Sequence, residues 1–244
     1  SVPRFWEKVY QAVKDKIDRS NPMQQKLFRH ALEIGRKYNL ECKSRCKRPS
    51  PMLAMEYKVF DKMVLRLVRK QLGLENANIF PTAGAAVSPE VERFAHSVGL
   101  NMVVGYGLTE SLATVSCDRE NMPYTIGSVG RPINGIDVKI GDNDEILLKG
   151  PTITVGYYRR DAANKEAFTE DGYFRTGDAG YIKNGELFLT DRIKDLFKTS
   201  NGKYIAPQMI ESLLLVDKFI DQVVVIANER KFVSALIVPE FRLV

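Results

Sequence analysis

The stretch NIFPTAGAAVSPEVERFAHSVGLNMVVGYG, residues 78–107, decides the fold class of this chain. NIFPTAGAA predicts a strand that enters a turn of small residues, and NMVVGYG predicts a second strand. The segment between them predicts a helix, because Ser88 is a good N-cap, Pro89 suits the first turn and Gly99 suits the C-terminal stop. A strand, a helix and a strand with short links predict a parallel βαβ unit and an α/β fold.

Three segments before this unit have apolar residues at helical spacing: residues 5–17, 24–38 and 57–72. A basic, proline-containing loop, ECKSRCKRPSP, is expected between the second and third helices. The residues expected on the buried faces are Trp6, Val9, Tyr10, Val13, Ile17, Leu27, Phe28, Ala31, Leu32, Tyr38, Val59, Phe60, Met63, Val64, Leu67 and Val68.

The pattern becomes rich in short strands after about residue 125. IDVKI and EILLKG predict strands, and YIKNGELFL predicts a hairpin with Asn184–Gly185 in a type I′ turn. A short helix, DAANKEAF, interrupts this region. After Asp191, the short strands DLFKT and KYI, the helix PQMIESLLLV and the strands QVVVIA and FVSALIVP predict the start of a small α+β domain.

The composition is ordinary for a soluble globular protein: 244 residues, 44% hydrophobic and 27% charged. No apolar run is long enough for a transmembrane helix, and the N-terminus resembles neither a signal nor a transit peptide. The three cysteines, Cys42, Cys46 and Cys117, do not suggest a disulfide framework, so a reducing, cytoplasmic location is expected.

The net charge is +6, and much of it lies in residues 42–48 and 64–70. A solvated loop and a polar helix face explain this charge most simply. Peripheral contact with the inner face of an anionic membrane is the second interpretation. No nucleic-acid motif accompanies the charge, so no nucleic-acid partner is expected. The sequence does not predict an oligomeric state.

The residues GYGLTES, 105–111, suggest a ligand site where the second predicted strand ends. Gly105 and Gly107 would let the backbone approach a flat ligand and leave one face of Tyr106 open for stacking on a base. Thr109 offers a hydroxyl to a phosphate, and Glu110 offers an oxygen ligand to Mg²⁺. The alternative is a tight turn followed by a capped helix, whose N-terminus Glu110 would favour.

Two later blocks carry further polar groups. GYFRTGD, residues 172–178, is expected to present Asp178 on a turn after a strand, where its carboxylate could accept hydrogen bonds from a ribose. The alternative is an aspartate that binds its own backbone. TDRIKDLFKTSNGKYI, residues 190–205, is either functional or a solvated basic hairpin, and it contains Arg192, Lys194, Lys198, Gly202 and Lys203.

YGLTE, YFRTGD and DRIKDLFKTSNGKYIAP, in this order, resemble the adenylate-forming superfamily of AMP-binding acyl-CoA synthetases, above all the long-chain fatty acyl-CoA ligases. VPRFWEKVY, PTAGAAVSPEV and GSVGRPINGIDVKI look like the same family, so the resemblance covers nearly the whole chain. It implies that residues 1–122 form part of the α/β subdomain of the large domain. Residues 123–191 would form its β-rich subdomain, and residues 192–244 the start of a C-terminal lid.

The resemblance also implies roles for single residues. Tyr106, between Gly105 and Gly107, matches the aromatic residue that stacks on adenine, and Glu110 matches the Mg²⁺ ligand. Lys194 matches the hinge between the two domains. The remaining matches are Gly84, Ala85 and Ala86 beside the adenine and the acyl entrance, Thr109 at a phosphate, Asp178 and Arg192 at the ribose, and Lys198 and Gly202 in the loop that moves for thioester formation.

The implied activity is that of a long-chain fatty acid–CoA ligase, an AMP-forming acid–thiol ligase that uses ATP, Mg²⁺ and coenzyme A. A fatty carboxylate attacks the α-phosphate of ATP, and the thiol of coenzyme A then attacks the acyl-AMP. Thr109, Glu110 and Lys198 are the expected catalytic residues, although the protein mainly positions the reactants. Rotation of the lid about Lys194 would gate the second step.

The chain departs from the family pattern in two places. The glycine-rich phosphate loop that ends in Pro-Lys-Gly and the C-terminal adenylation lysine have no counterpart in these residues. We therefore expect an internal fragment that is inactive alone and that exposes apolar surface on the helices between Trp6 and Leu72.

Three alternatives stay open. The first is a fatty acyl-AMP ligase that transfers the acyl group to a carrier protein. The second is a non-catalytic nucleotide- or acyl-binding module, against which the presence of Tyr106, Glu110, Asp178 and Arg192 argues. The third is a peripheral membrane scaffold. The sequence does not predict the acyl chain length.

Overall fold

The computed structural model describes residues 3–118, 122–198, 204–227 and 230–241. Helices and parallel and antiparallel strands are all present, so the predicted α/β class is confirmed. The chain divides into two compact units. The first unit comprises Ser1–Val104 and Asp118–Gly127, and the second comprises Gly105–Cys117 and Ser128–Val244. The division into domains 1–122, 123–191 and 192–244 stays a prediction.

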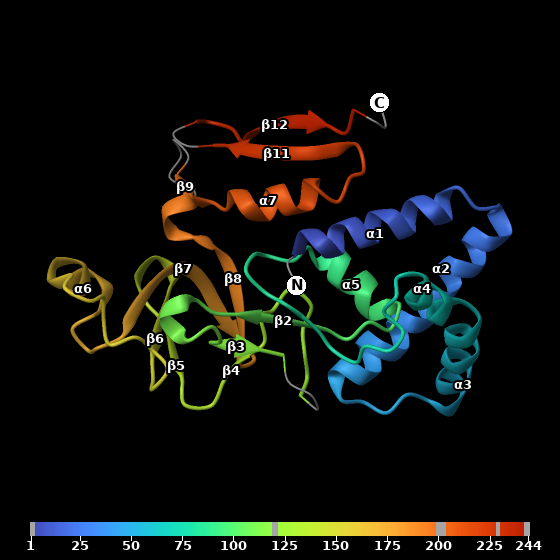
Figure 1. Cartoon of the computed structure of the whole chain (residues 1–244), viewed down its shortest axis with the longest axis horizontal. Helices are drawn as coiled ribbons and strands as arrows, with labels where there is room; N and C mark the ends of the chain where they lie inside the picture. The colour runs from blue at the N-terminus through green and yellow to red at the C-terminus, as the bar shows by residue number, and fades with distance from the viewer. Residues whose placement is uncertain (1–2, 119–121, 199–203, 228–229, 242–244) are drawn as a thin grey trace. The chain divides into compact units, whose positions relative to one another are not determined.

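The first two predicted helices are confirmed as α1 (Pro3–Asp18) and α2 (Pro22–Arg36) (Figure 1). The side chain of Asn21 caps α2 by accepting a 2.9 Å hydrogen bond from the backbone of Gln24. Beyond α2 the chain continues as a π-helical turn, η1 (Lys37–Cys42), and a 3₁₀ turn, η2 (Lys43–Arg45). Part of the predicted basic loop is therefore helical.

The third helix begins six residues earlier than predicted. It comprises α3 (Pro51–Phe60), the π turn η3 (Asp61–Leu65) and α4 (Arg66–Gln71). The early start follows from Ser50, whose hydroxyl accepts a hydrogen bond from the backbone of Leu53, and from Pro51 in the first turn. Leu65 is fully buried. The placement of Leu27, Val59, Met63 and Leu67 on buried faces is wrong, since these side chains are exposed.

The core of the first unit forms around Trp6, which is only 2% exposed. Its indole nitrogen donates a 2.8 Å hydrogen bond to Thr82, and its ring packs edge-on against Phe80. Thr82 and Phe80 belong to β1 (Phe80–Thr82), which pairs in parallel with β2 (Met102–Tyr106). The helix α5 (Pro89–Ser97) lies between these strands in the chain, so the predicted βαβ unit is confirmed.

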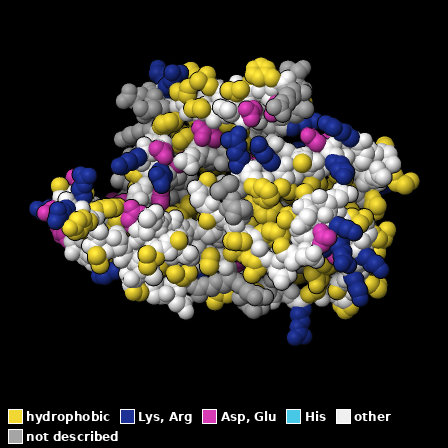
Figure 2. Space-filling view, in the orientation of Figure 1, with side chains coloured by type: hydrophobic (Ala, Val, Ile, Leu, Met, Phe, Trp, Pro, Cys, Tyr) yellow, Lys and Arg dark blue, Asp and Glu magenta, His cyan; other side chains and the backbone are white. Residues whose placement is uncertain are grey.

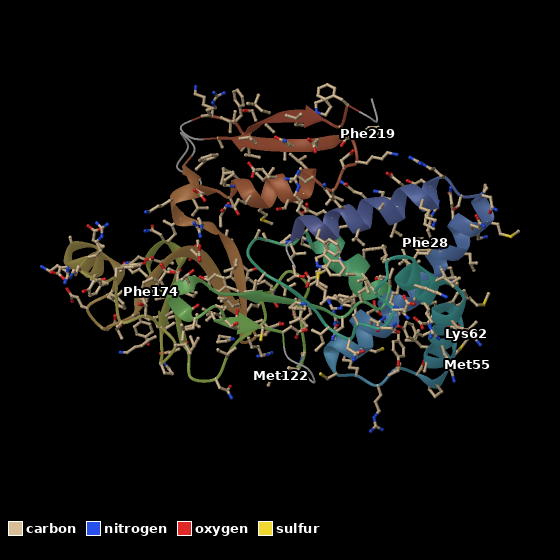
Figure 3. The ribbon with its side chains drawn as sticks, in the orientation of Figure 1. Phe28, Met55, Lys62, Met122, Phe174 and Phe219 are labelled. Carbon is tan, nitrogen blue, oxygen red and sulfur yellow. The ribbon has the colours of Figure 1, made fainter. Side chains whose placement is uncertain are left out.

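The second unit contains two antiparallel arrangements. The end of β2 pairs with β3 (Ser116–Cys117), which pairs with β4 (Arg131–Pro132). A separate sheet has the order β5 (Asp137–Ile140), β6 (Glu145–Lys149), β7 (Phe174–Lys183) and β8 (Glu186–Arg192). Phe174, labelled in Figure 3, is buried on this sheet together with Ile146, Leu148 and Leu187.

The connections of this sheet follow the sequence signals. Asn184 and Gly185 both have positive φ, 54° and 77°, as the predicted type I′ hairpin turn between β7 and β8 requires. A 3₁₀ turn, η5 (Asp142–Asp144), joins β5 to β6. The predicted short helix is α6 (Asp161–Ala167). Local backbone chemistry thus accounts for how the strands are joined.

After β8 come the 3₁₀ turn η6 (Ile193–Asp195) and two short strands, β9 (Phe197–Lys198) and β10 (Tyr204–Ile205). The chain then forms α7 (Pro207–Leu214) and an antiparallel pair, β11 (Ile220–Ile226) and β12 (Ser234–Pro239). Figure 1 shows α7 along the β11 side of this pair, where Glu211 accepts a 2.8 Å hydrogen bond from the backbone of Val225. The predicted elements of this region are confirmed.

Several large apolar side chains on the helices of the first unit face solvent (Figure 2). Phe28 is buried within α2, whereas Met55 on α3 is 66% exposed (Figure 3). The other exposed members are Met23, Leu27, Met52, Val59, Met63 and Leu67. Within the described ranges, none of the helices has the length and apolar character needed to cross a bilayer. The three cysteines are free thiols.

Two ionisable side chains are buried in α5. Burial, with a contribution from the charge of Asp118, raises the pKa of Glu92 to about 8, although Glu92 accepts a 2.8 Å hydrogen bond from the backbone of Gly127. Burial, with a contribution from Lys43, lowers the pKa of His96 to about 4. Both side chains are therefore neutral at about pH 7.

We predict that Glu92 makes the first unit less stable as the pH rises from 6.5 to 8. In this range folded His96 is neutral, and unfolded His96 loses its remaining charge just above its ordinary pKa of 6.5, which opposes the slope by only about 0.4 kcal/mol. Glu92 is mostly protonated when folded and is ionised when unfolded. A raised carboxyl pKa contributes stability that is lost as the pH rises toward the folded pKa, here about 2 kcal/mol over this range. Glu92→Gln should remove this slope.

The measurement is urea unfolding at several pH values, followed by the fluorescence of Trp6, the single tryptophan. Glu75→Gln, which changes an exposed carboxylate of the same unit, is the matched control and should keep the wild-type slope. An unchanged slope in Glu92→Gln would contradict the prediction.

Candidate functional site

The turn that follows β2 depends on one glycine. A Cβ atom on Gly107 would lie 1.6 Å from the carbonyl oxygen of Ala113, so no other residue fits without moving the backbone. The backbone of Val115 donates a 2.8 Å hydrogen bond to the carbonyl of Tyr106, which closes the turn onto β3. The predicted tight glycine turn is therefore present, and its reason is the close approach of two backbone segments.

The residues after this glycine form a single 3₁₀ turn, η4 (Thr109–Ser111). Its start is fixed by Ser111, whose hydroxyl accepts from the backbone nitrogen of Leu108 at 3.1 Å and donates to the carbonyl of Leu108 at 2.9 Å. Leu112 and Ala113 then adopt left-handed backbone angles, φ 53° and 80°, which end the turn and reverse the chain. The capped helix of the alternative interpretation is therefore limited to this single turn.

Tyr106 is 7% exposed, and its hydroxyl donates a 2.7 Å hydrogen bond to Oδ2 of Asp178. Burial and, next, the charge of Asp178 raise the pKa of this phenol, so it stays a neutral donor. The expectation that one ring face would be open is wrong for this structure. The ring is enclosed, and its hydroxyl group is anchored to β7, a strand of the other four-stranded sheet.

Asp178 lies inside β7, so its expected position on a turn after a strand is wrong. Its backbone pairs with Arg192 of β8, and an irregularity in the register follows at Ala179 and Gly180. Thr176 accepts a 3.0 Å hydrogen bond from the backbone of Asp178. The side chain of Asp178 therefore lies beside an irregular position of β7, and such irregularities can redirect a side chain, here toward Tyr106.

Arg192 contributes the third side chain of this group. Its Nε lies 3.5 Å from Oδ1 of Asp178, and the Arg192 side chain is 72% exposed. Such an exposed ion pair adds little stability. The guanidinium therefore keeps donors available for a ligand, as its predicted ribose contact requires.

Glu145 supports the segment that carries Asp178, and no sequence pattern indicated this role. This buried carboxylate accepts a 3.2 Å hydrogen bond from the backbone of Gly177 and a 2.9 Å hydrogen bond from Arg175. Because the two donors come from β7 and the carboxylate from β6, Glu145 fixes the backbone directly before Asp178.

Tyr157 is a second residue that sequence reasoning missed. Its hydroxyl donates a 2.8 Å hydrogen bond to Oε1 of Glu110, and the backbone of Thr154 donates a 2.7 Å hydrogen bond to the carbonyl of Glu110. The side chain of Asn164 in α6 accepts a hydrogen bond from the backbone nitrogen of Tyr157 and donates one to its carbonyl oxygen. Burial and, next, the bond to Glu110 raise the pKa of Tyr157. The GYY sequence at this place contains no signal for the contact.

The other predicted site residues are placed as follows. Gly84, Ala85 and Ala86 lie in the first unit, exposed after β1. Lys194 is exposed in η6. Lys198 lies in β9, opposite Tyr204, but its side chain and the whole of Gly202 lie outside the described residues. The structure thus brings Tyr106, Asp178 and Arg192 together, and their roles and those of the other residues stay predictions.

Glu110 is the only predicted metal ligand. Within the described residues, no group of three His, Cys, Asp or Glu side chains could hold a metal ion. Mg²⁺ usually binds one or two protein carboxylates together with water and substrate phosphates, rather than a cage of protein ligands. A half-buried Glu110 beside the exposed hydroxyl of Thr109 fits a magnesium ion that is shared with a nucleotide.

Known proteins resemble this chain along most of its length. Long-chain-fatty-acid–CoA ligase FadD15 of Mycobacterium tuberculosis is 34% identical over 240 residues, which cover 97% of this chain and 38% of that protein. Long-chain-fatty-acid–CoA ligase 1 of Schizosaccharomyces pombe is 31% identical, with 98% of this chain and 36% of that protein covered. The chain therefore spans a little over a third of the length of these relatives.

A solved structure shows the same arrangement of elements. The A domain of a carboxylic acid reductase from Segniliparus rugosus, in complex with AMP and a co-purified carboxylic acid, matches with a TM-score of 0.67 and 25% identity. The match covers 98% of this chain and 34% of that one. Residues 1–158 match the family described as AMP-binding enzyme. The chain belongs to the AMP-binding enzyme family.

Proposed function

We propose that this chain is part of a long-chain fatty acid–CoA ligase, an AMP-forming enzyme that activates a fatty acid with ATP and transfers it to coenzyme A. The observation that carries the proposal is the hydrogen bond between Tyr106 and Asp178, because it joins two segments that the family resemblance assigns to one nucleotide site. The names of the Mycobacterium tuberculosis and Schizosaccharomyces pombe relatives support the same reaction.

The nucleoside half of the site consists of Tyr106, Asp178 and Arg192. A carboxylate has about four acceptor positions, and the contacts with Tyr106 and Arg192 use two of those of Asp178. Two ribose hydroxyls can therefore donate to the same carboxylate. Tyr106 keeps the carboxylate in one orientation, and the exposed Arg192 can add a donor to the ribose. Adenine would then pack along the Gly105–Gly107 turn.

The phosphate half of the site consists of Thr109, Glu110 and Tyr157. The Thr109 hydroxyl can donate to a phosphate oxygen, and Glu110 would hold Mg²⁺, which when bound neutralises phosphate charge. Tyr157 donates to one oxygen of Glu110, which restricts the rotation of the carboxylate and leaves its other oxygen available. Positioning and charge neutralisation of this kind account for most of the catalysis of phosphoryl and adenylyl transfer.

The second step is proposed to depend on the segment after β8. Lys194 would act as the hinge, and Lys198 and Gly202 would lie in the loop that supports attack by coenzyme A. Gly84, Ala85 and Ala86 would line the adenine and acyl entrance, where small side chains leave room. Coenzyme A is favoured as acceptor over a carrier protein because the relatives in mycobacteria and yeast are named CoA ligases.

We predict that this chain binds an acyl-adenylate through Asp178. A non-hydrolysable palmitoyl-adenylate analogue should bind saturably in a calorimeter. Asp178→Ala should weaken binding at least about tenfold, because hydrogen bonds to a charged group contribute about 1.5–3 kcal/mol each. Tyr106→Phe should weaken it less, since the carboxylate remains but loses its orienting donor.

Asp171→Ala is the matched control, because it removes an exposed carboxylate from the segment just before β7. It should leave affinity unchanged. Equal affinity of wild type and Asp178→Ala, with circular dichroism showing both folded, would refute the nucleoside half of the proposal. Palmitoyl transfer to coenzyme A or to a carrier protein, measured with the natural protein that carries this sequence, distinguishes the two acceptors.

We predict that Tyr157 strengthens magnesium binding by Glu110. Tyr157→Phe should raise, by about three- to tenfold, the Mg²⁺ concentration that supports half-maximal binding of a non-hydrolysable ATP analogue, because the Glu110 carboxylate loses a donor of about 1 kcal/mol. Glu110→Gln should abolish the magnesium dependence. Binding is followed by calorimetry on the natural protein, so the readout does not depend on turnover.

Tyr158→Phe is the matched control, since this neighbouring ring is 83% exposed. It should behave as wild type. If Glu110→Gln changes the magnesium dependence but Tyr157→Phe does not, the role of Tyr157 is excluded and the metal assignment stands.

A further inference from the structure

The outer face of α3, η3 and α4 has an unusual composition. Five apolar side chains are exposed, and four basic side chains are exposed between them. We define this basic–apolar face by its apolar members, Met52, Met55, Val59, Met63 and Leu67, and by its basic members, Lys58, Lys62, Arg66 and Lys70. Figure 3 shows Met55 and Lys62 on the outer side of these helices, and Figure 2 shows blue and yellow side chains over the same elements.

The π turn keeps the apolar residues in one line. After Met55, the apolar members recur every four residues. In an α-helix, residues four apart drift by about 40° around the axis at each step. The turn η3 (Asp61–Leu65) has wider, i→i+5 hydrogen bonding, which offsets this drift between Val59 and Leu67. The result is a continuous apolar stripe instead of one that winds around the helix.

The two acidic side chains of this segment are partly buried. Asp61 forms a 2.7 Å ion pair with Arg69, which also donates to the backbone carbonyl of Val98. Glu56 is half-buried. The inward side packs through Leu65, which is fully buried, and through Tyr57, which stacks on Tyr38 at 4.0 Å. The outward side therefore carries positive charge without an exposed carboxylate between Met52 and Lys70.

The segment directly before α3 is also basic. Lys43, Arg45, Lys47 and Arg48 are all exposed directly before α3. An apolar stripe edged by Lys and Arg is the pattern of helices that lie in a membrane interface, with the apolar face among the acyl chains and the bases at anionic headgroups. Long basic side chains can extend sideways to reach those headgroups while their stems cover apolar surface.

We propose that the basic–apolar face docks this chain on an anionic lipid surface. The occupant follows from charge complementarity: basic side chains edge the stripe along its length, so a negatively charged surface is favoured, and the apolar stripe requires a surface that accepts hydrocarbon. An uncharged bilayer would not attract the basic side chains of the face, and a polar anion would leave its methionines exposed to water. The inference is independent of the proposed enzymatic function.

The test is co-flotation of the 244-residue chain with vesicles of phosphatidylcholine alone or mixed with phosphatidylglycerol. Wild type should bind the mixed vesicles and should be released by raised salt. The triple variant Lys58→Gln, Lys62→Gln, Arg66→Gln should lose about tenfold or more in partition coefficient, because each base near an anionic surface contributes about one kcal/mol. The triple variant Met55→Gln, Val59→Gln, Met63→Gln should lose a similar amount.

The matched control is Lys8→Gln, Lys14→Gln, Arg19→Gln, which removes the same charge from exposed positions of α1 and its end. It should keep most of the binding. All substituted side chains are exposed, so circular dichroism should show unchanged folding. Equal binding by the methionine–valine variant would show adsorption by charge alone and would overturn the proposal.

Two other results would also overturn it. The first is a folded wild-type chain that binds neither kind of vesicle. The second is a wild-type dimer that becomes a monomer in the methionine–valine variant, because the face would then serve contact between two copies of the chain.

Discussion

The hydrogen bond from Tyr106 to Asp178 is the interaction on which the candidate site depends. It joins residues 72 positions apart, one at the end of β2 and one inside β7. The phenol is nearly enclosed, so without this acceptor it would lose its partner in a place that water does not reach. Asp178 is in turn fixed by its pairing with β8 and by the Glu145 contact to Gly177. One bond thus holds the glycine turn against the four-stranded sheet of the second unit.

Local signals in the sequence were sufficient for most of the fold. Ser88 with Pro89, and Asn184 with Gly185, act through their own backbone geometry, so the helix start and the hairpin they predict are present. The error at the third helix has the same origin. Ser50 and Pro51 form the same N-terminal signal as Ser88 and Pro89, but they follow a run of basic residues that suggested a loop. The local signal outweighed the composition.

The sequence indicated candidate site residues, but it did not indicate their contacts. Three ordered blocks of sequence indicated Tyr106, Glu110, Asp178 and Arg192. The bond from Tyr106 to Asp178 and the bond from Tyr157 to Glu110 join side chains of segments 72 and 47 positions apart, and no periodic pattern encodes such contacts. The role of Glu145 could not be predicted for the same reason, because its partners lie about 30 positions further along the chain. Contacts between segments far apart in the sequence therefore decide which carboxylates have partners.

The glycine turn after β2 has a consequence for the cost of binding. Gly107 meets the backbone of Ala113, and Ser111 binds both backbone groups of Leu108. Val115 closes the turn onto Tyr106, and Thr154 holds Glu110, so the residues from Tyr106 to Val115 have little freedom left. Their conformational entropy is lost when the chain folds, before any nucleotide arrives. A ligand that binds this turn has few backbone torsions left to restrict, so little conformational entropy is lost on binding. Its affinity then depends mainly on the contacts that it makes.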